Sequence, residues 1–291
     1  MRYTTLTQSA PIYFNFYNRS IFTLKRMNHT LFSAAYNCLQ ATDPAVKIQL
    51  SRVTAEQWHT GQLSLLDDTP VLPITMAGHP PQLKLVHPRA VPKRKMQTPE
   101  GQIALLHAIA HIEFNAINLA WDAVYRFRQL PCAFYADWIK VAVEEAYHYE
   151  LLSIELAKRG CCYGDLPAHS GLWDMAVETA EDVLVRMALV PRVLEARGLD
   201  ASPYIIQRLQ QAGSADLVTI LQIILHDEIG HVAIGTRWFQ HFCAERGLLP
   251  TETFLQLLKK HYTGKIHAPF NTVARLAAGF STEELSLLEQ L

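Results

Sequence analysis

Apolar residues recur at helical spacing along four long segments of the chain, and this pattern predicts its architecture. In the first segment Ile103, Leu106, Ala110 and Ile117 share one helix face. Proline and glycine, which interrupt helices, separate the segments. The expected helices run from Thr98 to Gln129, from Cys132 to Arg159, from near Leu172 through Ile206 and Leu209, and from Ala215 to Arg246. We therefore predict an all-α protein built on a four-helix bundle.

Shorter helical patterns flank this bundle. Residues 28–60 predict two short helices separated by a turn at Asp43-Pro44, and residues 61–100 are rich in proline with little periodicity. Two more helices are expected at residues 252–261 and 283–290. The predicted organisation is an N-terminal extension (1–97), the bundle (98–246) and a C-terminal helical tail (247–291).

Each of the four apolar faces is interrupted by a glutamate near its centre. Two of these glutamates belong to Glu-x-x-His motifs, in which the two side chains project from one face of a helix. Paired motifs of this kind on separate helices are typical of metal sites in helical bundles. The candidate ligands are Glu113, Glu145, His148, Glu195, Glu228 and His231.

The spacing of the glutamates repeats in the two halves of the bundle. Glu113 precedes Glu145 by 32 residues across Pro131, and Glu195 precedes Glu228 by 33 residues across Gly213. In an antiparallel hairpin, residues nearly equidistant from the turn lie at the same height. The repeat therefore predicts that all four carboxylates meet in one shared site.

Burying four carboxylates without compensation is costly, because each loses several kcal/mol of solvation. Two divalent cations supply four positive charges, and a mixed oxygen and imidazole donor set suits iron or manganese better than zinc or calcium. We predict two metal ions, with iron preferred and manganese as the alternative. His107, His111 and His226 lie off the ligand faces, so we expect them to be core or surface histidines. Tyr147 and Tyr149 flank His148 and are expected to pack rather than to act in redox chemistry.

The third helix leaves two alternatives open. Gly198 and Pro203 predict local irregularity, which is either a kink or a break. Its ligand is predicted to be Glu195, because only this residue matches the spacing of the other hairpin. Glu181 falls on the same face, however, and Glu178 lies on the same helix.

Composition narrows the classes of function. A net charge of −1 and a pI near 6.9 argue against binding nucleic acid through bulk electrostatics. Five cysteines without metal-type spacing indicate reduced thiols in a cytoplasmic protein. No continuous apolar run approaches the roughly 18 residues of a membrane span. Residues 1–42 lack Asp and Glu, so we expect a surface arm or a true start at Met27.

At these residues the sequence resembles the ferritin-like superfamily of di-iron carboxylate proteins, in which a Glu and a Glu-x-x-His motif occur twice. The resemblance covers residues 98–246. The strings His111-Ile112-Glu113, Glu195-Ala196-Arg197-Gly198-Leu199-Asp200 and Asp227-Glu228-Ile229-Gly230-His231-Val232 are similar to a bacterial family of ferritin-like proteins of unknown function. The Glu-Ala-Arg string is also similar to the di-iron tRNA hydroxylase, which supports Glu195 as a ligand.

The resemblance implies roles for the ligands and a class of chemistry. Glu113 and Glu195 are expected as terminal ligands, Glu145 and Glu228 as bridging or chelating ligands, and each histidine as the donor of one nitrogen. The implied function is an O2- or peroxide-activating oxidoreductase with a small-molecule or lipid-like substrate, an electron donor and, as one option, a homodimeric state. Iron handling of the ferroxidase type and a metal-stapled interaction protein are the alternatives. A tRNA substrate is less favoured because the chain lacks an extended basic stripe.

Overall fold

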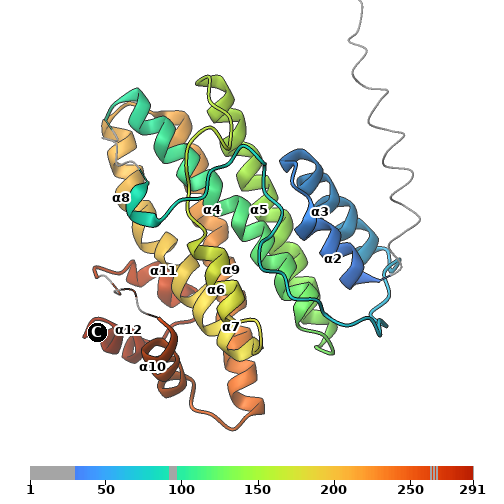
Figure 1. Ribbon diagram of the computed structural model, residues 1–291. Coiled ribbons are helices and arrows are strands. Elements are labelled where there is room, and N and C mark those ends of the chain that lie inside the picture. Colours follow the sequence, from blue (N-terminus) through green and yellow to red (C-terminus); the bar gives the residue numbers. More distant parts are fainter. Residues whose placement is uncertain (1–29, 92–96, 263, 265, 267, 291) are drawn as a thin grey trace, which may run out of the picture.

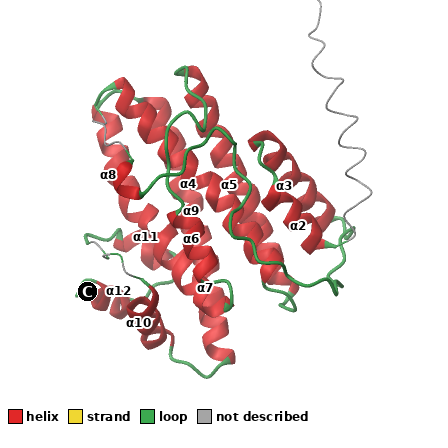
Figure 2. Cartoon of the chain, viewed as in Figure 1, coloured by secondary structure: helices red, strands yellow, loops and turns green. Residues whose placement is uncertain are grey.

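The computed structural model describes residues 30–91, 97–262, 264, 266 and 268–290. Within these residues the protein is all-helical, as predicted, and its only strand-like pairings are two isolated bridges, Thr30 with Ser64 and Leu85 with Ala168. Figure 2 shows helices joined by loops throughout the described chain. The prediction of a start at Met27, and that of a surface arm as far as it concerns residues 1–29, lie outside the described ranges, whereas residues 31–40 form a largely buried helix.

The N-terminal helices form as predicted. Helix α2 (Leu31–Gln40) begins at the cap Thr30, and helix α3 (Pro44–His59) begins at Asp43, whose side chain accepts hydrogen bonds from the first-turn amides. The following segment, up to the start of the next long helix, contains only the 3-10 turn η2 (Pro88–Ala90) among its described residues. Helices α2 and α3 pack against α4 and α5, the two helices that follow (Figure 1).

The first, second and fourth long helices match their predicted ranges closely. They are α4 (Pro99–Arg126), α5 (Cys132–Lys158) and α9 (Ala215–Glu245). Helices α4 and α5 form a closely packed hairpin, and α9 packs against α5. This arrangement brings the middle of all three helices, where the predicted ligands lie, to the same level.

The third helical region is interrupted where the sequence did not predict it. It consists of α6 (Gly171–Glu178), α7 (Val183–Leu189), the π-helix η3 (Val190–Glu195) and α8 (Ala196–Gln211). The chain does not break at Gly198 or Pro203, because both residues lie within the continuous helix α8. The irregularity falls instead at Pro191, which has no N–H to donate to the preceding turn. Its ring packs where Gly235 of α9 leaves room, since a Cβ on Gly235 would lie 2.2 Å from Pro191 Cγ.

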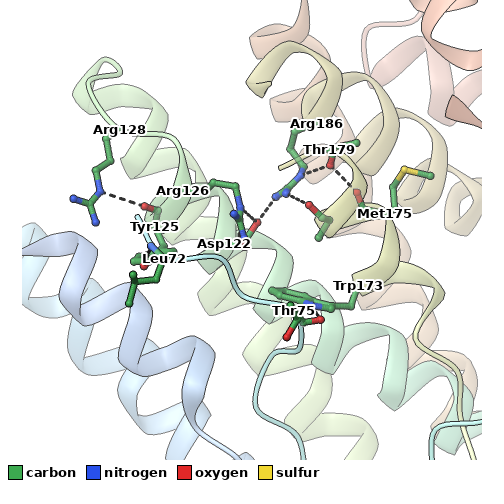
Figure 3. Close-up of polar contacts among 11 residues, drawn as sticks. Leu72, Thr75, Asp122, Tyr125, Arg126, Arg128, Trp173, Met175, Thr179 and Arg186 are labelled. Carbon is green, nitrogen blue, oxygen red and sulfur yellow. Dashed lines mark hydrogen bonds and ion pairs between the residues drawn. The ribbon is translucent and has the colours of Figure 1, made fainter. Parts of the chain in front are cut away.

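A buried ion pair joins the third region to the first long helix (Figure 3). The Arg186 side chain is 1% exposed, and its Nη1 donates to Asp122 Oδ2 at 2.6 Å. Asp122 also accepts from Arg126 at 2.8 Å, and Arg186 Nε donates to the Thr179 hydroxyl. Because a charge stripped of water is stable only when paired, these contacts fix α7 against α4.

A buried lysine fastens the N-terminal helices in a similar way. Lys47 Nζ donates to the carbonyl oxygens of Cys38 and Leu39 at 2.6 and 3.2 Å and to Asn118 Oδ1 of α4 at 2.7 Å. These three acceptors match the three N–H groups of an ammonium. Burial lowers the pKa of Lys47 to about 7.

The C-terminal tail folds back onto the third and fourth helical regions. It contains α10 (Pro250–His261), α11 (Thr272–Ala277) and α12 (Thr282–Leu288), of which α11 was not predicted. Buried apolar side chains from the extension, the long helices and the tail form a continuous core. The three-part division at residues 97 and 246 stays a prediction.

Among the residues that the structure describes, two helices are long and apolar enough, by length and composition, to cross a membrane. These are α4 and α9, and 61% and 50% of their most apolar windows are buried within the fold. Core helices pass the same test. Both helices are central here, and each carries predicted ligands at its buried middle.

Candidate metal centre

The fold brings four of the six predicted ligands into one buried group. One ligand atom from each of Glu113, Glu145, His148 and Glu228 lies within 4.8 Å of the others. All four residues are buried, and they come from α4, α5 and α9. This group has the burial and the donor set needed to hold a metal ion.

The second histidine, His231, faces the same carboxylates. Its Nδ1 lies 2.9 Å from Glu145 Oε1 and 3.8 Å from Glu228 Oε2. His148 Nδ1 lies 3.3 Å from Glu145 Oε2 and 3.3 Å from Glu113 Oε2. The two carboxylate oxygens of Glu145 therefore face different histidines, which places Glu145 at the centre of the cluster.

Several atoms of the cluster have no hydrogen-bond partner in the protein. Buried polar atoms in proteins almost always have partners, so a set of unpartnered atoms in one place calls for a ligand. Among the described residues, four of the nine unpartnered buried side-chain atoms belong to predicted ligands. They are Glu195 Oε2 and Glu228 Oε2, together with Glu145 Oε1 and His231 Nδ1, which face each other at 2.9 Å without hydrogen-bond geometry. The residues present therefore fit a metal-binding role.

Glu195 belongs to the same electrostatic environment although it stands outside the 4.8 Å group. It ends the π-helix η3, and burial together with the charge of Glu145 raises the pKa of its carboxyl to about 8. His231 acts in the opposite direction. The alternatives Glu178 and Glu181 are both exposed, so only Glu195 of the three faces the cluster.

The cluster holds protons in the absence of a cation. Burial and the neighbouring charge of Glu145 raise the pKa of Glu113 to about 8 and that of Glu228 well above its ordinary value. Burial opposes the charged form of His148, but hydrogen bonds with Glu113 and Glu145 outweigh it and raise the histidine pKa to about 12. Burial also opposes the charged form of His231, but the charge of Glu145 and the hydrogen bond with Glu144 outweigh it and raise the pKa of His231 well above its ordinary value. Protons thus neutralise charge that a metal ion would otherwise neutralise.

Each histidine also contacts a carboxylate on its outer side, which sequence reasoning missed. His148 Nε2 lies 3.0 Å from Asp227 Oδ2, and His231 Nε2 lies 3.0 Å from Glu144 Oε2. The contacts are reciprocal, since Asp227 of α9 serves the histidine of α5 and Glu144 of α5 serves the histidine of α9. A proton on Nε2, donated to these carboxylates, leaves Nδ1 free as a metal donor. The available signal was an acidic residue directly before each Glu-x-x-His motif.

His107, His111 and His226 lie outside the cluster, in core or surface positions. His107 Nε2 accepts from the amide of Gly164 at 2.9 Å, and His111 lies 2.9 Å from the Tyr163 hydroxyl and from the carbonyl oxygen of His169. Both hold the loop that follows α5. His226 is exposed.

The two tyrosines beside His148 differ in their surroundings. Tyr149 packs against Phe114 and Tyr163, with ring centroids 5.3 Å apart in both cases, and its burial raises the pKa of the phenol. Tyr147 is exposed. Tyr149 therefore packs as expected, while Tyr147 lies at the surface.

Comparison with known proteins identifies relatives of the chain. A family model described as "Protein of unknown function (DUF455)" matches residues 40–286. The chain is similar to an uncharacterized protein of Haemophilus influenzae (strain ATCC 51907 / DSM 11121 / KW20 / Rd), with 46% identity over 239 residues that cover 79% of this chain and 83% of that protein. No solved structure matches the chain. The matched range contains all six predicted ligands and both outer carboxylates.

Proposed function

This chain belongs to the DUF455 family of proteins of unknown function, and we propose that it is a ferritin-like protein whose long helices bind two metal ions, with iron as the native metal. The observation that carries the proposal is the set of unpartnered, converging ligand atoms in the buried cluster. Four carboxylates balance two divalent cations, and two imidazoles add one neutral donor to each ion.

The chain's own residues have defined tasks in this proposal. Glu145 faces both histidines and is the candidate bridging ligand. Glu228, whose Oε2 lies 3.8 Å from His231 Nδ1, is the second candidate for a bridging or chelating role. Glu113 and Glu195 complete the two ends of the site. Asp227 and Glu144 hold the histidine rings in the orientation and tautomer that present Nδ1.

Buried apolar side chains neighbour the ligands on their helices. One helical turn from the ligands, Ala110, Ile117, Val141, Leu152 and Ile224 are all buried. An apolar enclosure of this kind strengthens electrostatic interactions inside it and protects reactive species from water. These features favour a reactive centre over a purely structural one.

We propose an O2- or peroxide-activating oxidoreductase as the activity. When bound, a pair of redox-active ions supplies the electrons that reduce the oxidant. The protein supplies the fixed carboxylates, the oriented histidines and the apolar enclosure. The substrate class we propose is a small organic or lipid-like molecule, with a separate electron donor.

The test begins with metal content. The protein is loaded anaerobically with Fe²⁺, metal per chain is measured by mass spectrometry, and O2 consumption and absorbance are followed on mixing with O2. We expect two irons per chain and O2 uptake that Glu145→Gln and Glu228→Gln abolish. Glu178→Gln is the matched control, because this exposed glutamate of α6 should leave both properties unchanged.

Other outcomes separate the alternatives. Iron that is oxidised repeatedly and released without an organic substrate would assign the protein to iron handling. If the protein binds metal but takes up no O2, and if removal of the metal unfolds it, the metal has a structural role. The proposal would be overturned if the folded and fully stable protein bound less than one metal ion per chain.

A further inference from the structure

A second cavity, apart from the metal centre, lies between the third helical region and the C-terminal tail. Its volume is about 270 Å³, near the lower limit for pockets that bind small organic molecules. Arg192 and Arg197 line it from η3 and α8, while Phe254, Phe270 and Arg275 line it from the tail. Arg192 and Glu195 belong to the same π-helix, but only Arg192 lines this cavity. The tail thus closes a pocket on the face of η3 that is turned away from the cluster.

The charge around the cavity favours an anion. Asp200 is engaged by Arg275, whose Nε and Nη2 donate to it at 3.0 and 2.7 Å. Glu284 is engaged by Arg192 Nη2 at 2.6 Å. Both carboxylates are therefore neutralised by arginines, and Arg197, which is exposed and lines the cavity, remains as an excess positive charge.

The inner wall has a donor without an acceptor. Arg192 is 1% exposed in its side chain, and its guanidinium carbon lies 4.1 to 4.6 Å from the ring centroids of Phe239, Phe254 and Phe280. Its Nη1 has no hydrogen-bond partner and is itself buried beneath the cavity surface. A buried guanidinium N–H without a partner is costly, and an oxyanion is the acceptor that it binds most strongly.

The rest of the lining is apolar. Val193, Ile266, Phe270 and Leu288 border the cavity beside the arginines. Such walls bind a hydrocarbon or aromatic body and would give little affinity to a bare inorganic ion. The arginines and the apolar wall together call for a molecule with a charged head and an apolar body.

From this arrangement we propose that the cavity binds a small organic oxyanion, a carboxylate or phosphate ester with an apolar body, as a ligand separate from the metal centre. The anionic head pairs with Arg197, close to the buried guanidinium of Arg192, and the apolar body lies against Phe254 and Phe270. Because Arg192 and Glu195 both belong to η3, the organic anion binds on the side of this helix opposite to the cluster that Glu195 faces. The binding itself requires no metal.

The experiment is isothermal titration calorimetry on the full chain, with benzoate and phenyl phosphate as probes and with benzamide and inorganic phosphate as comparisons. Metal-stripped and metal-loaded protein are both titrated. We expect benzoate or phenyl phosphate to bind in both states, and benzamide and inorganic phosphate to bind at least tenfold more weakly, since each lacks one half of the recognised structure.

Variants locate the binding. Ala201 is exposed and lines the cavity, so Ala201→Trp should block it, whereas Gln207→Trp changes an exposed position of α8 outside the lining. Arg197→Gln should weaken binding about tenfold, and Arg208→Gln, on the same helix but outside the lining, should not. Equal binding of benzamide and benzoate, no binding of either organic anion, or full binding to a folded Ala201→Trp protein would each overturn the proposal.

Discussion

The outer carboxylates offer the sharpest test of the metal centre, because they touch the histidines without being predicted ligands. Asp227→Asn removes the charge that faces His148 Nε2 at 3.0 Å while preserving the shape of the side chain. A charge-assisted hydrogen bond contributes about 1.5 to 3 kcal/mol. Because the Asp227 side chain is 26% exposed and the amide oxygen still accepts, we expect the lower value. This corresponds to about a tenfold loss of metal affinity.

The affinity is measured by anaerobic competition of Fe²⁺ or Mn²⁺ between the protein and a chelator. Glu144→Gln should have the same effect through His231, whose Nε2 lies 3.0 Å from Glu144. The combined loss in the double variant should differ from the sum of the two single losses, because both histidines contact Glu145 and their ring centroids lie 5.8 Å apart. Asp216→Asn is the matched control, since Asp216 is exposed in the first turn of the same helix α9.

If both variants bind metal with unchanged affinity and stoichiometry, the histidines do not present Nδ1 to a metal ion. The reciprocal contacts between α5 and α9 would then be ordinary buried ion pairs. A loss of affinity that the Asp216→Asn control shares would instead point to a general effect of charge.

Three further predictions concern stability. Asp122→Asn leaves Arg186 buried without its counterion and should lower the free energy of unfolding, measured by urea titration, by about 3 kcal/mol. As a control, Glu150→Gln removes an exposed ion pair with Arg52 and should lower it by less than about 1 kcal/mol. Equal losses in the two variants would contradict the role given to burial. Lys47→Met leaves three oxygen acceptors without a donor and should lower the free energy of unfolding by about 2 to 4 kcal/mol in the same assay. An unchanged urea midpoint would show that Lys47 does not hold the N-terminal helices against α4. In metal-free protein the pKa of Glu113 is raised to about 8, so the folded state binds more protons than the unfolded state between about pH 4.5 and 8. The melting temperature of this protein should therefore fall as the pH rises across this interval, and it should recover at pH 8 when Fe²⁺ or Mn²⁺ is added. A melting temperature that rises with pH would contradict the assignment.

The positions of α4, α5 and α9 followed from the sequence alone. Helical periodicity and breakers such as Pro131 and Gly160 act within a few residues, so they are readable without tertiary structure. Glu113 and Glu145 lie at similar distances in the sequence on either side of the turn at Pro131, and helix geometry alone then places them at the same height. The structure accordingly places the two residues in one buried group.

The pairings across helices were decided by the tertiary structure. Glu144 and Asp227 looked like ordinary charged residues in the sequence, and their contacts with His231 and His148 exist only because α5 and α9 pack side by side. The π-helix formed at Pro191 rather than at Gly198 or Pro203 because Gly235, far along the chain, makes room for the proline ring. Local sequence thus determined the helices and the residues on their inner faces. Which of these side chains meet depended on contacts between distant residues, whose energies appear only when the helices pack.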